Sequence, residues 1–102
     1  MDKTNALDIV QKYAELLRSK FIFQKMILFG SYVRGNSRKD SDIDVAIVFS
    51  DYENRLDRQV ELMKLTRQID TRIEPHPFRE KEFEMSNPFV YEIMSNGLEI
   101  AI

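Results

Sequence analysis

Residues 28–35 read Leu-Phe-Gly-Ser-Tyr-Val-Arg-Gly, and residues 41–48 read Ser-Asp-Ile-Asp-Val-Ala-Ile-Val. The two stretches predict a strand that ends in a Gly-Ser turn and, after a short polar break, a second strand that opens with two carboxylates. Side chains two positions apart in a strand point to the same face, so Asp42 and Asp44 should project together. The sequence therefore places two anions side by side at the start of a strand.

Paired carboxylates of this kind are suited to binding divalent cations. Their Cα atoms would be about 6.6 Å apart, near enough for both side chains to share two cations spaced roughly 3.5–4 Å apart. Residues 46–49 are apolar on both faces, which is typical of a strand covered on both sides, so the acids should stand at the edge of a core. There the two charges repel unless a cation or a proton offsets them. Mg²⁺ is favoured, because it takes oxygen ligands and is completed by waters and substrate phosphates.

The Gly-Ser turn predicts a phosphate site beside the acids. Gly30 would let backbone amides approach a phosphate closely, because glycine adopts conformations that other residues avoid. Ser31 suits the N-cap of a short helix over residues 32–34, where amides and the helix dipole favour an anion. A triphosphate fits that description.

The order Gly30-Ser31, Arg34-Gly35 and residues 41–45 (Ser-Asp-Ile-Asp-Val) resembles the signature of the polymerase-β-like nucleotidyltransferase superfamily, and specifically its minimal, single-domain members. The resemblance covers the two strands and their link, and extends to the chain length and the order of elements. It implies a polymerase-β-like nucleotidyltransferase fold, which is α+β (α/β-like), with a small mixed β-sheet flanked by helices. Residues 1–102 would form one domain.

The resemblance also implies roles for particular residues in a Mg²⁺-dependent nucleotidyl transfer. Asp42 and Asp44 would bind two Mg²⁺ ions, and a third carboxylate on a neighbouring strand would bind the first ion or take the proton of the attacking hydroxyl. Glu74 is the best match for this third carboxylate, although an aspartate is usual there. Asp70 is the competing candidate.

The phosphates of ATP or another nucleoside triphosphate would be held by the turn. Gly30, Ser31 and Arg34 are the residues expected to bind them, through position and charge rather than covalent chemistry. An alternative for Arg34 is a salt bridge with Asp40 at the end of the short helix. Arg38 and Lys39 could contact phosphates or a partner, although a solvated loop is the more ordinary interpretation of residues 36–40.

Larger members of the superfamily carry an added domain for the acceptor of the nucleotide, for which this short chain has no room. The acceptor is therefore expected on a separate protein. Minimal members resemble the antitoxin half of two-gene modules whose companion is a helical HEPN-type protein. The implied activity is transfer of AMP from ATP to a tyrosine of that companion, which inactivates it. A rival hypothesis is a catalytically weak or inactive nucleotide-binding subunit that masks or supports a helical partner. Transfer to a small molecule such as an aminoglycoside is less favoured by the short chain.

The composition excludes several other classes of function. The net charge is −2 with 31% charged residues, so no overall basic character is available to grip duplex nucleic acid. The chain has no cysteine and a single histidine, His76, which excludes disulfides and makes a zinc site improbable. Neither a signal peptide nor a membrane-spanning run is evident, so no membrane association and a cytoplasmic location are expected.

The remaining segments predict a frame around the two acidic and glycine-rich stretches. Helices are expected over residues 6–17, capped by Thr4 or Asn5, over residues 54–69, and over residues 81–85 and 88–96. Strands are expected over residues 25–29, 71–78 and 98–102. Met63 should fill a gap in the core. His76 should be a half-exposed residue at a strand end, and contact with the nucleotide is the less favoured alternative.

Two prolines bear on how the sheet ends. Pro75 and Pro77 should confine the strand over residues 71–78 to a sheet edge, because proline cannot donate a ladder hydrogen bond. An exposed edge and a small core would make a homo-oligomer conceivable.

Overall fold

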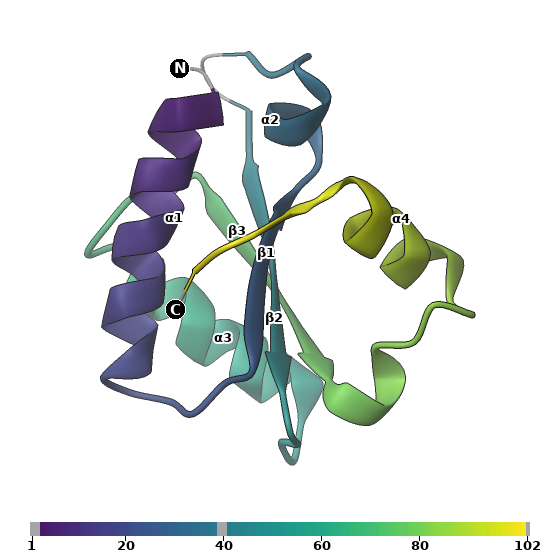
Figure 1. Cartoon of the computed structure of the whole chain (residues 1–102). Coiled ribbons are helices and arrows are strands. Elements are labelled where there is room, and N and C mark those ends of the chain that lie inside the picture. The colour runs from purple at the N-terminus through teal and green to yellow at the C-terminus, as the bar shows by residue number, and fades with distance from the viewer. Residues whose placement is uncertain (1–2, 39–40, 102) are drawn as a thin grey trace.

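The computed structural model describes residues 3–38 and 41–101 (Figure 1). Its helices are α1 (Lys3–Arg18), α2 (Ser31–Arg34), α3 (Arg55–Thr66) and α4 (Pro88–Asn96), with a 3-10 turn η1 (Glu80–Glu82). Its strands are β1 (Lys25–Phe29), β2 (Ile43–Phe49), β3 (Ile73–Arg79) and β4 (Leu98–Glu99). Within the described ranges, no helix combines the length and the apolar character needed to cross a lipid bilayer.

The four strands form one mixed sheet in the order β3-β2-β1-β4. β1 pairs antiparallel with β2 and with β4, whereas β2 and β3 run parallel. Helix α3 makes the crossover between the parallel strands, as a parallel pair requires. The predicted small mixed sheet flanked by helices is therefore confirmed.

The edge strand β3 is closed to further strands by its own sequence. The prolines at 75 and 77 offer no N–H group. Their carbonyl oxygens accept hydrogen bonds from Gln59 Nε2 (3.3 Å) and from the Tyr52 hydroxyl (3.2 Å). The prediction of an edge position is confirmed, but this edge is poorly suited to self-association by strand addition.

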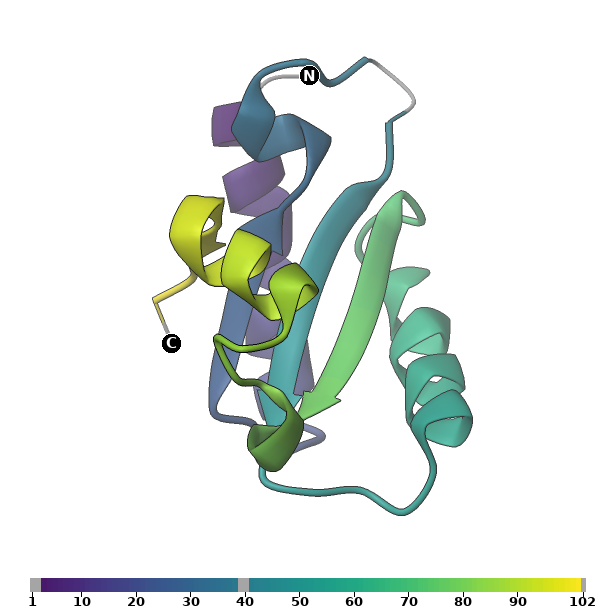
Figure 2. The same ribbon diagram turned by 90° about the vertical axis from the view of Figure 1, so that its right-hand side faces the viewer.

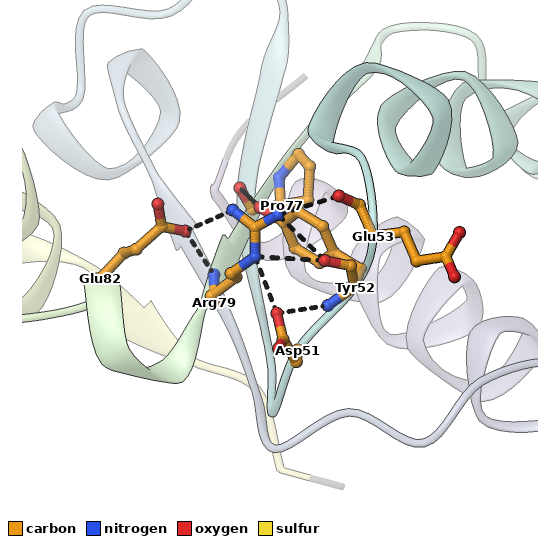
Figure 3. A network of polar contacts seen from close by, with 6 residues as sticks. All are labelled: Asp51, Tyr52, Glu53, Pro77, Arg79 and Glu82. Carbon is orange, nitrogen blue, oxygen red and sulfur yellow. Dashed lines mark hydrogen bonds and ion pairs between the residues drawn. The ribbon is translucent and has the colours of Figure 1, made fainter.

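The far end of β3 is anchored by Arg79 (Figure 3). Its Nε donates to Asp51 Oδ1 at 2.8 Å, and its Nη2 donates to the carbonyl oxygens of Tyr52 (2.9 Å) and Glu53 (3.2 Å). The guanidinium also lies 4.4 Å from the centroid of the Tyr52 ring. These contacts fix the loop between β2 and α3 at the end of β3 that is remote from Glu74.

The main core lies between the sheet and the helices α1 and α3. In Figure 1, α1 and α4 stand on opposite sides of the sheet, and Figure 2 shows α3 and α4 separated by β2 and β3. Alternate residues of the strands point toward α1 and α3, where they are buried. The largest members of this cluster are Tyr13, Leu17, Met26, Leu28, Tyr32, Ile43, Ile47, Phe49, Leu62 and Ile73.

The opposite side of the sheet carries a smaller core beneath α4. It contains Ile27, Ala46, Phe78, Val90 and Ile93, with Phe29, Phe83 and Met94 packed against it. Helix α4 begins as predicted, because Asn87 Oδ1 accepts from the backbone N–H groups of Phe89 (2.9 Å) and Val90 (3.4 Å). Helix α4 covers only part of this face of the sheet, so polar residues of β2 and β3 can lie on the same face.

Gly97 follows the last residue of α4, and its backbone is extended (φ −76°, ψ 167°). Position 97 requires glycine because there is no room for a side chain. A Cβ at this position would collide with the carbonyl oxygen of Ile93 and lie 2.6 Å from Cγ2 of Ile27. The close approach lets the chain turn directly from α4 into β4.

Three details of the helices differ from prediction. The helix predicted over residues 81–85 is only the 3-10 turn Glu80–Glu82. Helix α1 begins at Lys3, so positions 4 and 5 lie inside the helix and do not cap it. Met63 does not fill the core: 44% of its surface is exposed, as is 69% of Leu56 on the same helix. The apolar residues of α3 spread over a wider face of the helix than the sheet covers. The helix buries Leu62 and Thr66 and leaves its outer apolar residues in solvent.

Candidate active site

The turn after β1 is formed by Gly30, which has φ 83° and ψ −149°. L-residues with a side chain rarely adopt this conformation. The space around Gly30 imposes a second requirement, because a Cβ here would lie 2.5 Å from Oδ2 of Asp44. The antiparallel register, which pairs Phe29 with Asp44, causes this close approach. One of the two predicted carboxylates therefore lies directly against the turn.

Ser31 is the first residue of α2 and not its N-cap, so that prediction is wrong. Gly30 occupies the cap position, without a side-chain cap. The carbonyl oxygen of Gly30 accepts hydrogen bonds from the N–H groups of Val33 and Arg34, both at 3.1 Å. The turn is thus closed by the backbone, which leaves the Ser31 hydroxyl available for a ligand.

Tyr32 is a structural residue of the site that the sequence did not single out. Its side chain is buried, and its hydroxyl donates toward the carbonyl oxygens of Ser41 (3.3 Å) and Arg38 (3.4 Å). These contacts tie the link between β1 and β2 to α2, immediately before Asp42. A lone tyrosine between Ser31 and Val33 carries no sequence signal for this role.

Three carboxylates lie together on one face of β2 and β3. Asp42 immediately precedes β2, and Asp44 is paired in register with Glu74 of β3. The pKa of Glu74 is raised above its ordinary value of 4.5, first by its hydrogen bond with Asp42, and also by burial and by the charges of Asp42 and Asp44. The structure therefore gathers Asp42, Asp44 and Glu74.

Asp70, the competing third carboxylate, is engaged elsewhere. Its Oδ2 lies 2.6 Å from Nη2 of Arg72, and its Oδ1 accepts from the backbone N–H of Arg72 at 2.9 Å. The hydrogen bond from the Arg72 side chain is the main cause that lowers the pKa of Asp70 below 3.8. Of the two candidates, Glu74 is the one that stands beside the aspartate pair.

His76 belongs to the same cluster, although the sequence predicted a half-exposed residue at a strand end. It lies in the middle of β3, and its side chain is 20% exposed. Its Nε2 is 3.2 Å from Oδ1 of Asp44, a hydrogen bond in which the imidazole N–H donates. The prediction was wrong because the two-residue period that places Glu74 on this face also places His76 there. The two-residue strand period could therefore have predicted that His76 lies on the acidic face.

The donor set is compatible with Mg²⁺. Among residues 3–38 and 41–101, no three Asp, Glu or His side chains form a ready-made group of ligands for one ion. Mg²⁺ does not need such a group, because it commonly binds through one or two carboxylates together with waters and substrate phosphates. The contact between Asp42 and Glu74 also concentrates negative charge, which a divalent cation would offset. Asp42 and Asp44 are the oxygen donors best placed for it.

A cavity of about 280 Å³ opens beside this cluster. Gly30, Arg34, Asp44 and His76 line it on the sheet side, together with Phe29 and Val33, and α4 contributes Phe89, Glu92 and Asn96. Arg34 therefore lines the same space as the turn and Asp44, as a phosphate-binding residue should. The alternative pairing of Arg34 with Asp40, and the proposed contacts of Lys39, fall outside the described residues.

The comparison with protein families agrees with this geometry. Residues 11–101 match the family described as "Polymerase beta, Nucleotidyltransferase". Because the match covers most of the chain, the protein belongs to the polymerase-β-like nucleotidyltransferase family. Its fold is that of this class.

Two relatives give a finer comparison. The protein adenylyltransferase MntA of Thermococcus cleftensis is 35% identical over 48 residues, which are 47% of this chain and 48% of that protein. A relative from Methanocaldococcus jannaschii is 36% identical over 44 residues, 43% of this chain and 44% of its own length. The matched segments therefore span less than half of each relative.

Solved structures show the same fold over most of the chain. A toxin–antitoxin structure with AMP-PNP has a TM-score of 0.69 at 24% identity, and covers 89% of this chain and 72% of that one. A variant of the MntA-HpeT toxin–antitoxin pair has a TM-score of 0.66 at 26% identity, with coverages of 88% and 69%. The likeness therefore covers nearly nine-tenths of this chain.

Proposed function

We propose that this chain is a Mg²⁺-dependent adenylyltransferase that moves AMP from ATP to a tyrosine hydroxyl of a helical HEPN-type partner, and so acts as an antitoxin. The observation that carries the proposal is the cluster of Asp42, Asp44 and Glu74, in which Asp44 lies against the Gly30 turn. Family membership supports nucleotidyl transfer as the reaction class. The relative named protein adenylyltransferase MntA supports AMP as the transferred group and a protein as the acceptor.

The proposed reaction is a single displacement at the α-phosphorus of ATP. The hydroxyl oxygen of the acceptor forms a new P–O bond, while the bond from the α-phosphorus to the bridging oxygen breaks and pyrophosphate leaves. Bound Mg²⁺ would activate the hydroxyl and offset charge on the leaving oxygens. Glu74 would accept the hydroxyl proton, and the raised pKa of its carboxylate suits a base at neutral pH better than an ordinary glutamate.

The other residues would act by position and charge. Asp42 and Asp44 would hold Mg²⁺ against the α-phosphate. The backbone at Gly30, the Ser31 hydroxyl and the Arg34 guanidinium would hold the remaining phosphates, because developing negative charge is stabilised by fixed donors that need no rearrangement. This division leaves no covalent enzyme intermediate in the pathway. Since ATP is the substrate, we place the reaction in the cytoplasm.

The toxin–antitoxin assemblies among the similar structures support a separate protein partner. A second candidate function uses the same partner without catalysis: the chain would bind a nucleotide, or only mask the partner. One observation favours it, namely the hydrogen bond from His76 to Oδ1 of Asp44, which competes with a metal ion for that oxygen. The two functions differ in whether the carboxylates are required.

The test is transfer of labelled AMP from ATP to the purified partner in the presence of Mg²⁺. We expect label on a partner tyrosine with the wild-type protein, and none with Asp42→Asn. Glu15→Gln serves as a matched control, because Glu15 is an exposed carboxylate on α1. Inhibition of the partner that survives the double change Asp42→Asn with Asp44→Asn would overturn the enzymatic proposal and establish the mask.

A further inference from the structure

We infer that the α4 side of the cavity is the nucleobase site, and that it selects a base with an exocyclic amine, such as adenine, through Phe89, Glu92 and Asn96. The inference rests on the proposed function, because it assumes that the phosphates of a nucleotide lie at the Gly30 turn. It adds what the acidic cluster does not supply, a structural basis for choosing the base.

The aromatic part of the cavity is suited to a planar ring. Phe89 is 45% exposed although it packs against Phe29, with the ring centroids 5.7 Å apart and the planes nearly perpendicular. His76 lies 5.3 Å from Phe29 and 6.4 Å from Phe89 by ring centroids. A partly exposed aromatic cluster at a cavity wall offers faces on which a base can stack.

Phe89 is also held in place before any ligand binds. The N–H of its backbone donates to Asn87 Oδ1 at 2.9 Å in the cap of α4, and its ring contacts Phe78 as well as Phe29. Binding a base would therefore order few additional side chains, so little of the stacking free energy would be offset by lost conformational entropy.

The polar groups come from the same face of α4. Glu92 and Asn96 follow Phe89 by three and seven positions, which places all three side chains along one side of the helix. Within the described residues, neither Glu92 nor Asn96 makes a side-chain hydrogen bond or an ion pair. These two groups are thus available to a ligand in the cavity.

The charge of Glu92 decides which part of a nucleotide can lie there. A carboxylate repels phosphates, so the phosphates belong at the Gly30 and Arg34 side, and the uncharged base belongs against α4. A carboxylate accepts a hydrogen bond from an exocyclic amine, and an asparagine amide can pair with an adenine edge through two hydrogen bonds. Uracil presents a carbonyl oxygen in place of the amine, which leaves Glu92 without a donor.

The experiment measures the dissociation constants of ATP, UTP and tripolyphosphate by isothermal titration calorimetry with Mg²⁺ present. Wild-type protein should bind ATP about tenfold more tightly than UTP. Phe89→Ala should weaken both nucleotides about tenfold by loss of stacking. Asn96→Ala should reduce the preference for ATP over UTP, because Glu92 alone then distinguishes the bases, and neither change should alter tripolyphosphate binding.

Two comparisons keep the test decisive. Tyr91→Ala removes an aromatic side chain of the same helix that is 56% exposed and does not line the cavity, so it should bind ATP like wild type. If Phe89→Ala loses its cooperative thermal transition, Asn96→Ala still gives a reading, because Asn96 is exposed at the end of α4.

The unfavourable outcomes separate the two proposals. Unchanged ATP binding in both Phe89→Ala and Asn96→Ala would overturn the base site and leave the proposed function standing. If Phe89→Ala leaves ATP binding unchanged and instead raises the KM for the acceptor protein, the cavity is the site of the acceptor ring. Failure of wild type to bind either nucleotides or tripolyphosphate would overturn the proposed function itself.

Discussion

The two faces of the sheet are built from the same strands and serve different purposes. Toward α1 and α3, alternate residues such as Val45 and Ile73 are buried in the main core. Toward α4, their neighbours Asp44 and Glu74 stand together at the edge of a smaller core. One face gains stability from burial, and the other accepts like-charge repulsion in order to hold ligands. Changes on the first face should therefore affect stability, and changes on the second should affect activity.

The largest effect is expected for Asp44→Asn on the acidic face. The amide keeps the shape of the side chain but removes the charge that would bind Mg²⁺, so AMP transfer should fall by at least about a hundredfold. Single-turnover transfer of labelled AMP measures the change, and thermal unfolding verifies that the fold is intact. Wild-type transfer by this variant would contradict the separation of the two faces.

On the face toward α1 and α3, Leu62→Ala should lower the free energy of unfolding by about 2–5 kcal/mol, because Leu62 is fully buried. Activity per folded molecule should stay within about twofold of wild type, as expected of a change that affects packing alone. Urea denaturation measures the stability. Leu56→Ala on the same helix is the control, and it should cost less than about 0.5 kcal/mol, because Leu56 is mostly exposed.

Gly30→Ala tests the turn after β1, which lies against Asp44. An alanine at φ 83° should cost about 1–2 kcal/mol in backbone strain, and its Cβ would also push the Asp44 carboxylate away. We expect lower stability together with a loss of transfer activity of about tenfold or more.

Gly35→Ala provides a matched comparison for this turn. Gly35 has nearly the same backbone angle, φ 82°, but a Cβ there would meet nothing within 4 Å. It should lose less stability than Gly30→Ala by thermal unfolding, because Gly35 is left-handed (ψ 13°) whereas Gly30 has ψ −149°, and because its Cβ meets no other atom. It should also keep its activity per folded molecule. Equal loss of activity in both variants would mean that backbone strain, and not contact with Asp44, controls the site.

The smallest effect is the pH dependence of stability. Because the folded state raises the pKa of Glu74, it binds a proton more readily than the unfolded state above pH 4.5, so stability declines as pH rises through the raised value. Glu74→Gln removes this decline and should be more stable near neutral pH by about 0.5 kcal/mol, a modest value because solvent screens the group. Urea denaturation at several pH values measures it.

Asp70→Asn should change the stability near neutral pH in the opposite direction from Glu74→Gln. The pKa of Asp70 is lowered by Arg72, so its contribution is present above pH 3.8 and is lost as pH falls through the lowered value. The variant should therefore be slightly less stable than wild type near neutral pH.

A Glu74→Gln protein that loses stability at neutral pH would show that the acidic face is not under charge repulsion.

Local pattern was sufficient to predict much of this protein. The Gly30 turn, the shared face of Asp42 and Asp44, the strand over residues 25–29 and the start of α4 at Pro88 are each decided by residues close together in the chain. A two-residue strand period, a capping asparagine and a glycine with no side chain act over a few bonds. They therefore do not depend on the rest of the fold, and the family resemblance used the same short-range features.

The tertiary structure decided what depends on distant segments. The parallel register that pairs Asp44 with Glu74 joins residues on either side of helix α3, and it also brings His76 to Asp44 and leaves Asp70 with Arg72. The sequence ranked Glu74 first but misplaced His76 and Met63. Register and exposure follow from how α3 and α4 pack on the sheet, and burial of a side chain is a property of its neighbours in space, which a single sequence does not contain.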